Sequence, residues 1–162
     1  PSTMNNPKTN IDIIPFSINH KEAIKTLNLE WLQKNFKVEP KDELVLSNPI
    51  EEIINKGGKI YYAQHLDEIV GTVSLLKINT TTFELSKMAV TEKAQGLGIG
   101  RQLIEFCIEE AQKLGIQKLI LYSNRQLKSA LHLYESFGFK EIPVESGVYE
   151  RADIKMELLL PQ

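Results

Sequence analysis

The 162-residue sequence contains very little cysteine and no long apolar run. Its single cysteine, Cys107, excludes an intrachain disulfide and is typical of a reducing compartment, so we expect a cytoplasmic protein. No stretch approaches the roughly 18 consecutive apolar residues that a membrane-spanning helix requires, and the polar start of the sequence lacks a signal-peptide core. We therefore expect a globular protein without a membrane partner.

The sequence also lacks an excess of charge and the common nucleophile and metal motifs. Nineteen basic residues face 21 acidic ones, for a formal charge of -2, which gives no reason to expect a nucleic-acid partner. No serine lies in a G-x-S-x-G motif. The histidines His20, His65 and His132 lack the spacing of metal ligands, so we expect no bound metal.

What is present is a patterned chain of one domain's size. Apolar residues, 42% of the total, alternate in some stretches and recur every three to four positions in others. The pattern predicts a mixed α/β domain over residues 11–162, preceded by a disordered or vector-derived tail at residues 1–10. Strands are predicted at residues 11–17, 59–65, 69–77, 83–90, 117–123, 139–144 and 154–160, the second to fourth as an antiparallel meander. Helices are predicted at residues 19–31, 49–56, 101–114 and 127–137.

Local signals indicate where some of these elements begin. Asn19 and Glu22 have the spacing of a capping box for the first helix. Residues 37–44 are charged and without period, which predicts an irregular connector, and Asn48 is the expected cap of the short helix that follows. Pro15 indicates that the first strand lies at a sheet edge or contains a bulge.

The strongest local signal is "AQGLGIGR" at residues 94–101, where three glycines alternate with other residues between a predicted strand and a predicted helix. A helix N-terminus presents unpaired backbone N–H groups and a partial positive charge. Glycine removes the side chains that would hold a ligand away from those groups. The segment is therefore typical of an anion site, most often for phosphate, with a tight turn kept for close packing as the alternative.

The spacing of these glycines does not match either of two common nucleotide-binding loops. A P-loop needs a Lys-Ser or Lys-Thr pair after its last glycine, and none follows Gly100. A dinucleotide loop counted from Gly96 would place its third glycine at Arg101, and the next predicted strand ends in Ser123-Asn124 without a carboxylate. Both nucleotide interpretations therefore fail.

The loop and its flanks resemble the GNAT acetyltransferase superfamily. Gln95-x-x-Gly98-x-Gly100 matches the family's [Q/R]-x-x-G-x-[G/A] signature. "ELSKMAV" at residues 84–90 is similar to the family's fourth strand, and "LHLYESFGF" at residues 131–139 is similar to its closing helix and turn. The resemblance implies the GNAT fold, a mostly antiparallel mixed sheet of about seven strands flanked by about four helices.

The resemblance also implies acetyl-CoA as the acetyl donor, with the loop amides on its pyrophosphate and the preceding strand along its pantetheine arm. Asn124 is a further implied contact, although it stands six residues before Ala130, and the usual family spacing would place the asparagine at Leu127. The other implied cofactor-binding residues are Met88, Ala89, Val90, Gln95, Gly96, Leu97, Gly98, Ile99, Gly100 and Arg101.

Two residues match catalytic positions of the family. Tyr134 matches a tyrosine that can protonate the leaving thiolate, for which a phenol with a pKa near 10 is suitable; the alternative is a packing tyrosine. Glu84 matches a general base that takes a proton from the ammonium form of the acceptor; the alternatives are substrate positioning or a solvated strand face. Cys107 lies on an apolar helix stripe, which predicts a buried small side chain rather than a nucleophile.

The acceptor side is less well specified by the sequence. We assign Trp31 and Arg151 to it, because an arginine could hold a carboxylate and nearby acidic residues could hold an ammonium group. Other candidates at the front and back of the domain are Phe36, Glu39, Asp42, Glu43, Tyr149, Glu150 and Asp153.

The expected function is transfer of an acetyl group from acetyl-CoA to a primary amine of a small molecule or amino-acid-like acceptor, by direct attack in a ternary complex. Two alternatives stay open: acetylation of protein lysines or N-termini, and a non-catalytic acyl-CoA sensor. The resemblance also allows a homodimer.

Overall fold

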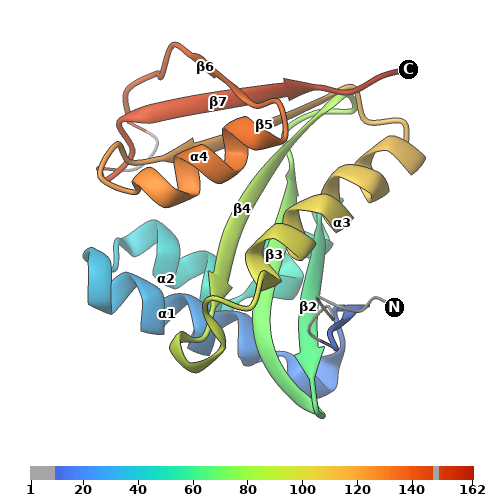
Figure 1. Ribbon diagram of the computed structural model, residues 1–162, viewed down its shortest axis with the longest axis vertical. Coiled ribbons are helices and arrows are strands. Elements are labelled where there is room, and N and C mark those ends of the chain that lie inside the picture. The colour runs from blue at the N-terminus through green and yellow to red at the C-terminus, as the bar shows by residue number, and fades with distance from the viewer. Residues whose placement is uncertain (1–9, 148–149) are drawn as a thin grey trace, which may run out of the picture.

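The computed structural model describes residues 10–147 and 150–162, and within them a seven-stranded sheet in the order β1-β2-β3-β4-β5-β7-β6 (Figure 1). Neighbouring strands are antiparallel except β4 and β5, which are parallel. The strands are β1 (Asp12–Pro15), β2 (Lys59–His65), β3 (Glu68–Lys77), β4 (Thr82–Val90), β5 (Lys118–Ser123), β6 (Lys140–Ile142) and β7 (Ile154–Leu159). The helices are α1 (Ala23–Asn35), α2 (Pro40–Ser47), α3 (Ile99–Lys113) and α4 (Lys128–Ser136), with short turns η1 (Ile18–His20), η2 (Ile50–Ile54) and η3 (Glu92–Ala94).

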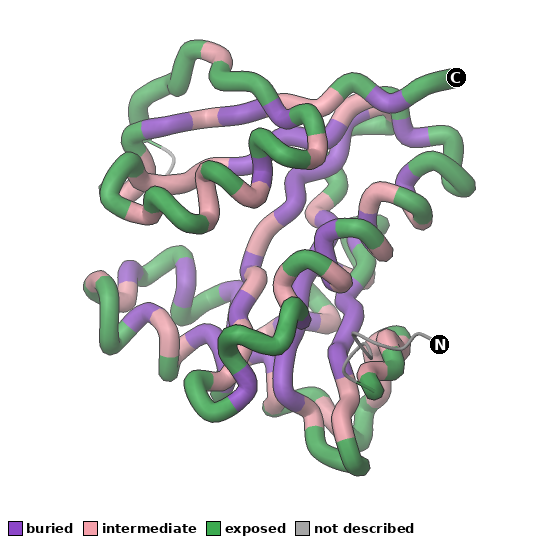
Figure 2. The backbone as a smooth tube through the Cα atoms, viewed as in Figure 1, coloured by how far each residue is buried: buried purple, intermediate pink, exposed green. Residues whose placement is uncertain are grey.

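The sheet separates two apolar cores, because successive side chains of a strand point to opposite faces. On β2, Ile60 and Tyr62 pack in one core with α1 and α2, whereas Tyr61 and Ala63 pack in the other with α3 and α4. Figure 2 shows buried residues along the central strands and on the inward sides of the helices. Burial on both faces explains the nearly continuous apolar sequence of β2.

The parallel pair β4 and β5 begins together and then diverges (Figure 1). β4 has nine residues, but only those from Thr82 to Glu84 lie opposite residues of β5, while pairing with β3 continues to Val90. A bulge interrupts the β3 pairing, since Ser86 and Ala89 have partners on β3 separated by a single residue. Lys87, inside this bulge, has φ +53°, an uncommon value for a residue other than glycine.

The segment predicted to be an irregular connector, residues 37–44, holds most of α2, and this prediction is wrong. Pro40 begins the helix, where its missing N–H costs nothing. Glu39 and Asp42 form a reciprocal capping box, each side chain accepting from the other residue's backbone N–H. The helix expected after Asn48 is the single π-helical turn η2.

The predicted cap of the first helix is also wrong. α1 begins at Ala23, and the Asn19 N–H donates to Ser17 Oγ at the start of η1. The predicted edge position of β1 is confirmed. Residues 1–9 of the predicted tail lie outside the described residues. Among the helices that are described, none is both long and apolar enough to cross a lipid bilayer.

Candidate active site

The glycine loop opens α3 and leaves backbone N–H groups for a ligand. Gly96 has φ +84° and Gly98, the residue before the helix, has φ +78°, values that strain any residue with a Cβ. The Gln102 N–H donates to the Gly98 carbonyl at 3.1 Å. The N–H groups of residues 99–101 therefore have no carbonyl partner within the helix, as expected for the first turn.

The space in front of the loop is open. Nothing lies within 4 Å of the position that a Cβ would take at Gly96 or Gly98, and the nearest atom at Gly100 is a Leu133 methyl at 4.0 Å. The loop and α4 enclose a cleft of about 470 Å³, which we call the loop cleft. These glycines therefore do not serve close packing, which was the alternative explanation for them.

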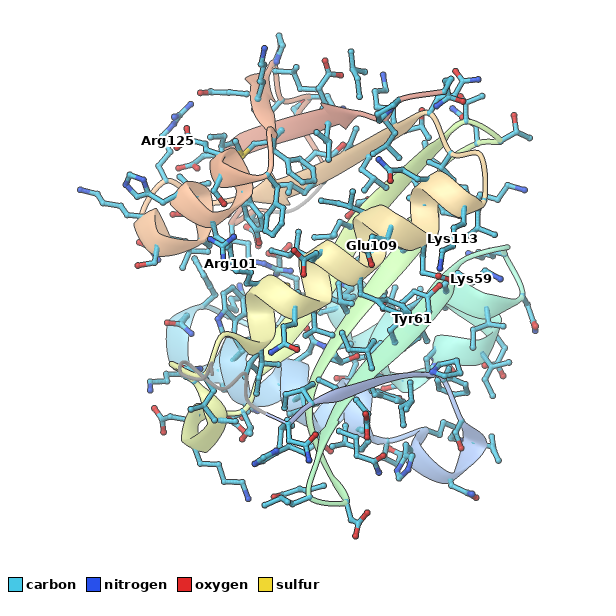
Figure 3. The ribbon with its side chains drawn as sticks, turned by 45° about the vertical axis from the view of Figure 1, so that its right-hand side comes forward. Lys59, Tyr61, Arg101, Glu109, Lys113 and Arg125 are labelled. Atoms are coloured by element: carbon cyan, nitrogen blue, oxygen red, sulfur yellow. The ribbon has the colours of Figure 1, made fainter. Side chains whose placement is uncertain are left out.

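Two side chains tie the loop to its neighbours. Gln95 Nε2 donates to the Val90 carbonyl at 3.2 Å, which joins the loop to the end of β4. The Arg101 guanidinium lies 5.1 Å from the Phe137 ring centre, with Nη2 3.4 Å from Ser136 Oγ at the end of α4 (Figure 3). Arg101 therefore offers its backbone to the loop cleft, while its side chain packs on α4.

A second cleft of about 500 Å³ contains side chains from both diverging strands, and we call it the central cleft. It adjoins the loop cleft, because Val90, Gln95 and Ser129 line both. Ala89 and Leu97, two of the predicted cofactor residues, line neither of the two clefts within the described chain. Ten predicted site residues and acceptor candidates line the central cleft, namely Trp31, Phe36, Asp42, Glu84, Met88, Val90, Gln95, Asn124, Tyr134 and Arg151.

The two predicted catalytic residues both lie in buried surroundings. Glu84 lies on β4 opposite Ile120 of β5 and is 7% exposed. Burial raises the pKa of its carboxyl group, against the opposing effects of a Ser86 hydrogen bond and nearby lysines. Tyr134, on α4, packs against Phe139, and burial raises its pKa to about 12. Tyr134 is therefore protonated at neutral pH.

Four charged side chains beside the central cleft form what we call the Asp42 cluster: Glu39, Asp42, Lys87 and Arg151. Arg151 donates to both carboxylate oxygens of Asp42 at 2.8 Å and to Glu39 Oε2 at 3.0 Å. Lys87 Nζ lies 3.1 Å from Asp42 Oδ1. Burial alone would raise the pKa of Asp42, but hydrogen bonds from Arg151 and the Glu39 N–H, with the Lys87 charge, lower it to about 2.

Some predicted site residues already form ion pairs or hydrogen bonds with other residues of the protein. Arg151, expected to hold a substrate carboxylate, already holds Asp42 and Glu39. Asn124 Nδ2 donates to the Arg151 carbonyl at 2.6 Å, and its Oδ1 accepts from the Gln126 N–H at 2.9 Å. The acceptor candidate Tyr149 lies outside the described residues.

The sequence argument missed Asn28 and Lys87, which both line the central cleft. Asn28 is 4% exposed, and its Nδ2 donates to the Ile24 carbonyl at 2.9 Å and to the Lys87 carbonyl at 3.1 Å. An asparagine on the apolar face of a predicted helix was the available signal, because a buried amide needs partners. Cys107 is fully buried as expected, and burial raises the pKa of its thiol.

A helix start with unpaired N–H groups thus lies beside a cleft between two diverging strands, and comparison with known proteins shows the family in which this arrangement occurs. The family model described as an acetyltransferase (GNAT) domain matches residues 56–141, more than half of the chain. The chain belongs to the GNAT acetyltransferase family. The predicted family and fold are confirmed.

One relative and two solved structures illustrate this membership. The chain is 32% identical over 132 residues to YvbK of Bacillus subtilis strain 168, described as an uncharacterized N-acetyltransferase, covering 77% of this chain and 85% of that protein. A GNAT acetyltransferase from Staphylococcus aureus Mu50 superposes with a TM-score of 0.82 at 25% identity, over 93% of this chain and 99% of that one. A GNAT acetyltransferase from Elizabethkingia anophelis with acetyl-CoA bound gives a TM-score of 0.66 at 25% identity, over 94% and 100%.

Proposed function

We propose that the protein, acting as a single domain over residues 11–162, transfers an acetyl group from acetyl-CoA to a primary amine of a small molecule or amino-acid-like acceptor. The observation that carries the proposal is that the two clefts adjoin and share Val90, Gln95 and Ser129 in their walls. One cleft ends at a helix start suited to phosphate, and the other reaches Glu84 and Tyr134. The acetyl-CoA bound to the Elizabethkingia relative supports this choice of donor.

Residues of both clefts would hold the donor. The N–H groups of residues 99–101 would bind its pyrophosphate at the positive end of α3. Met88 and Val90, on the part of β4 that has left β5, would lie along the pantetheine arm. Acetyl-CoA supplies a thioester, whose carbonyl carbon is the electrophile for an amine. Backbone N–H groups near Val90 would stabilise negative charge on the thioester oxygen.

Glu84 and Tyr134 would move the two protons of the reaction. An amine is an ammonium ion at neutral pH, so it must lose a proton before its nitrogen can form the new C–N bond. A Glu84 carboxylate oxygen would accept that proton, directly or through a water. As the C–S bond breaks, the Tyr134 hydroxyl would donate its proton to the departing sulfur.

A single set of measurements tests this function. The purified protein is incubated with acetyl-CoA and a panel of small amines, amino acids and peptides, and free thiol is followed together with the acetylated product. Coenzyme A binding is measured separately by calorimetry. Amine-dependent thiol release is expected. Tight coenzyme A binding without thiol release from any acceptor would instead support the sensor alternative.

A further inference from the structure

Two cationic side chains that line the central cleft, Arg151 and Lys87, are already paired with carboxylates of the protein. Arg151 and Lys87 face Asp42 and Glu39, two positive groups against two negative ones, in the Asp42 cluster. An acceptor carboxylate placed here would have to displace a bidentate ion pair that is largely removed from water. Lys128 also lines this cleft. It is the first residue of α4 and is followed by Ser129, which borders the loop cleft as well, so Lys128 lies toward the loop cleft.

Asn28 offers a hydrogen-bond acceptor at the same place. Its two contacts are carbonyl groups, so the atom that touches both must be the amide nitrogen, and this fixes how the side chain is turned. The described residues donate no hydrogen bond to Oδ1. If Oδ1 were fully buried, it would be a buried oxygen without a partner, and it is not one of these. The small exposed surface of Asn28 therefore includes Oδ1, and Asn28 lines the central cleft.

An aromatic wall follows Asn28 on the same face of α1. Trp31 and Leu32 lie three and four residues further along the helix, which places them beside Asn28. The Trp31 ring packs against Phe36 with ring centroids 5.4 Å apart, and all three apolar residues line the cleft. Trp31 and Phe36 are half-buried, so part of each ring is available to a ligand.

We propose, on the basis of the proposed function, that the acceptor is a primary amine on an aromatic or apolar body without a carboxylate beside the amine. Its ammonium group binds Asn28 Oδ1 and Glu84, and its body packs on Trp31 and Phe36. Within the general class of small or amino-acid-like amines, this selects arylalkyl and alkyl monoamines and disfavours free amino acids. The selection against carboxylates comes from the cost of displacing the Arg151–Asp42 ion pair as much as from attraction of the amine.

The decisive test compares three amines that share one aromatic body. The kcat/KM for acetylation is measured with 2-phenylethylamine, L-phenylalaninamide and L-phenylalanine. The first two should exceed phenylalanine by at least about tenfold, because only the amino acid brings a carboxylate, and Arg151 and Lys87 are already paired with Asp42 and Glu39. Equal or better use of phenylalanine than of its amide overturns the proposal.

A matched pair of variants tests the aromatic wall. Trp31→Leu should lower the preference for 2-phenylethylamine over ethylamine by roughly threefold to tenfold, because bulk remains and the ring is lost. Gln33→Ala, on an exposed position of the same helix, should leave that preference unchanged. An unchanged preference in Trp31→Leu, with its melting temperature retained, removes Trp31 from the acceptor site.

Binding measurements distinguish failure of this inference from failure of the proposed function. Affinities of 2-phenylethylamine and L-phenylalanine for the coenzyme A complex are measured by calorimetry, without turnover. Tighter binding of 2-phenylethylamine without any thiol release from acetyl-CoA would support the acceptor class and remove the catalytic function. Thiol release together with tighter binding of phenylalanine would support the catalytic function and remove the proposed acceptor class.

Discussion

Burial shifts the pKa values of Glu84 and Tyr134 in the same direction and serves both proposed roles. A raised carboxyl pKa brings Glu84 closer to the working pH, which makes it a better proton acceptor than an exposed glutamate. The pKa of about 12 at Tyr134 keeps its phenol protonated throughout the range in which the enzyme would work. Desolvation thus favours the neutral form of both groups, which keeps the Tyr134 phenol a proton donor and raises the proton affinity of the Glu84 carboxylate.

Replacing Tyr134 by phenylalanine should separate catalysis from packing. The ring would still pack against Phe139, so the fold and coenzyme A affinity should change little. We expect kcat to fall by about 100-fold or more, the usual contribution of a positioned general acid. Steady-state kinetics and calorimetry measure the two quantities, and unchanged turnover would remove the proposed role.

The pH profile should report Glu84. Since its carboxyl group must be deprotonated to accept a proton, kcat should rise with pH through a value above the usual 4.5 for glutamate. Glu84→Gln should lower kcat and abolish this acidic limb. Tyr134 should contribute no alkaline limb below about pH 10, because its pKa is about 12. A variant profile that matches the wild type would show that Glu84 is not the base.

At the scale of the elements, Gly98 and Gly100 at the start of α3 have different conformational requirements. Gly98→Ala should destabilise the fold by about 1 kcal/mol, because φ is +78° there, and it should also weaken coenzyme A binding. Gly100→Ala lies within the helix, where alanine is favoured by roughly 1 kcal/mol over glycine and its Cβ meets only a methyl at ordinary distance.

Gly100→Ala should therefore retain coenzyme A binding and unfold at an equal or higher temperature than the wild type. Thermal unfolding and calorimetry on the two alanine variants form an internally controlled pair. Equal losses in both variants would contradict the distinct roles assigned to Gly98 and Gly100.

Sequence patterns predicted the elements around this loop well, because α3 and α4 each carry one apolar stripe between clear stop signals. α2 was missed because its eight residues have no apolar period, and its capping box has glutamate before the helix and aspartate inside it. The bulge at Lys87 could not be predicted, since its positive φ depends on the β3 register and on Asn28 in α1. Asn28 stayed unassigned for the same reason.

At the scale of the whole molecule, the Asp42 cluster links three distant parts of the chain. Asp42 lies in the first turn of α2, Lys87 lies on β4, and Arg151 precedes β7. Sequence spacing cannot show such a cluster, because its members lie 45 and 109 residues from Asp42. It joins the start of α2 to β4 and to the segment before β7, beside the central cleft.

This cluster should make stability depend on acidity below pH 4. The folded pKa of Asp42, about 2, is below its ordinary value of 3.8, so its stabilising effect is complete above the unfolded value and is lost as pH falls toward 2. The size of this contribution is on the order of 2 kcal/mol. Denaturant unfolding at several pH values measures it.

Two matched variants assign that acid sensitivity. Asp42→Asn should cost about 3–5 kcal/mol at pH 7, because Arg151 and Lys87 would lose their shared partner. It should also flatten the dependence on pH below 4. Glu43→Gln, one residue away on the exposed side of α2, should change stability little, because solvent screens its pairing with Lys25. Equal effects of the two variants would contradict a special role for Asp42.

The early separation of β4 from β5 should be visible in deuterium uptake. Beyond Glu84, β4 pairs only with β3, so alternate backbone amides of residues 85–90 face away from any neighbouring strand of the described sheet. Without ligand these amides should take up deuterium quickly, although they belong to a central strand. A bound pantetheine arm would slow deuterium uptake at these amides selectively, because it would accept their hydrogen bonds where β5 has moved away from β4.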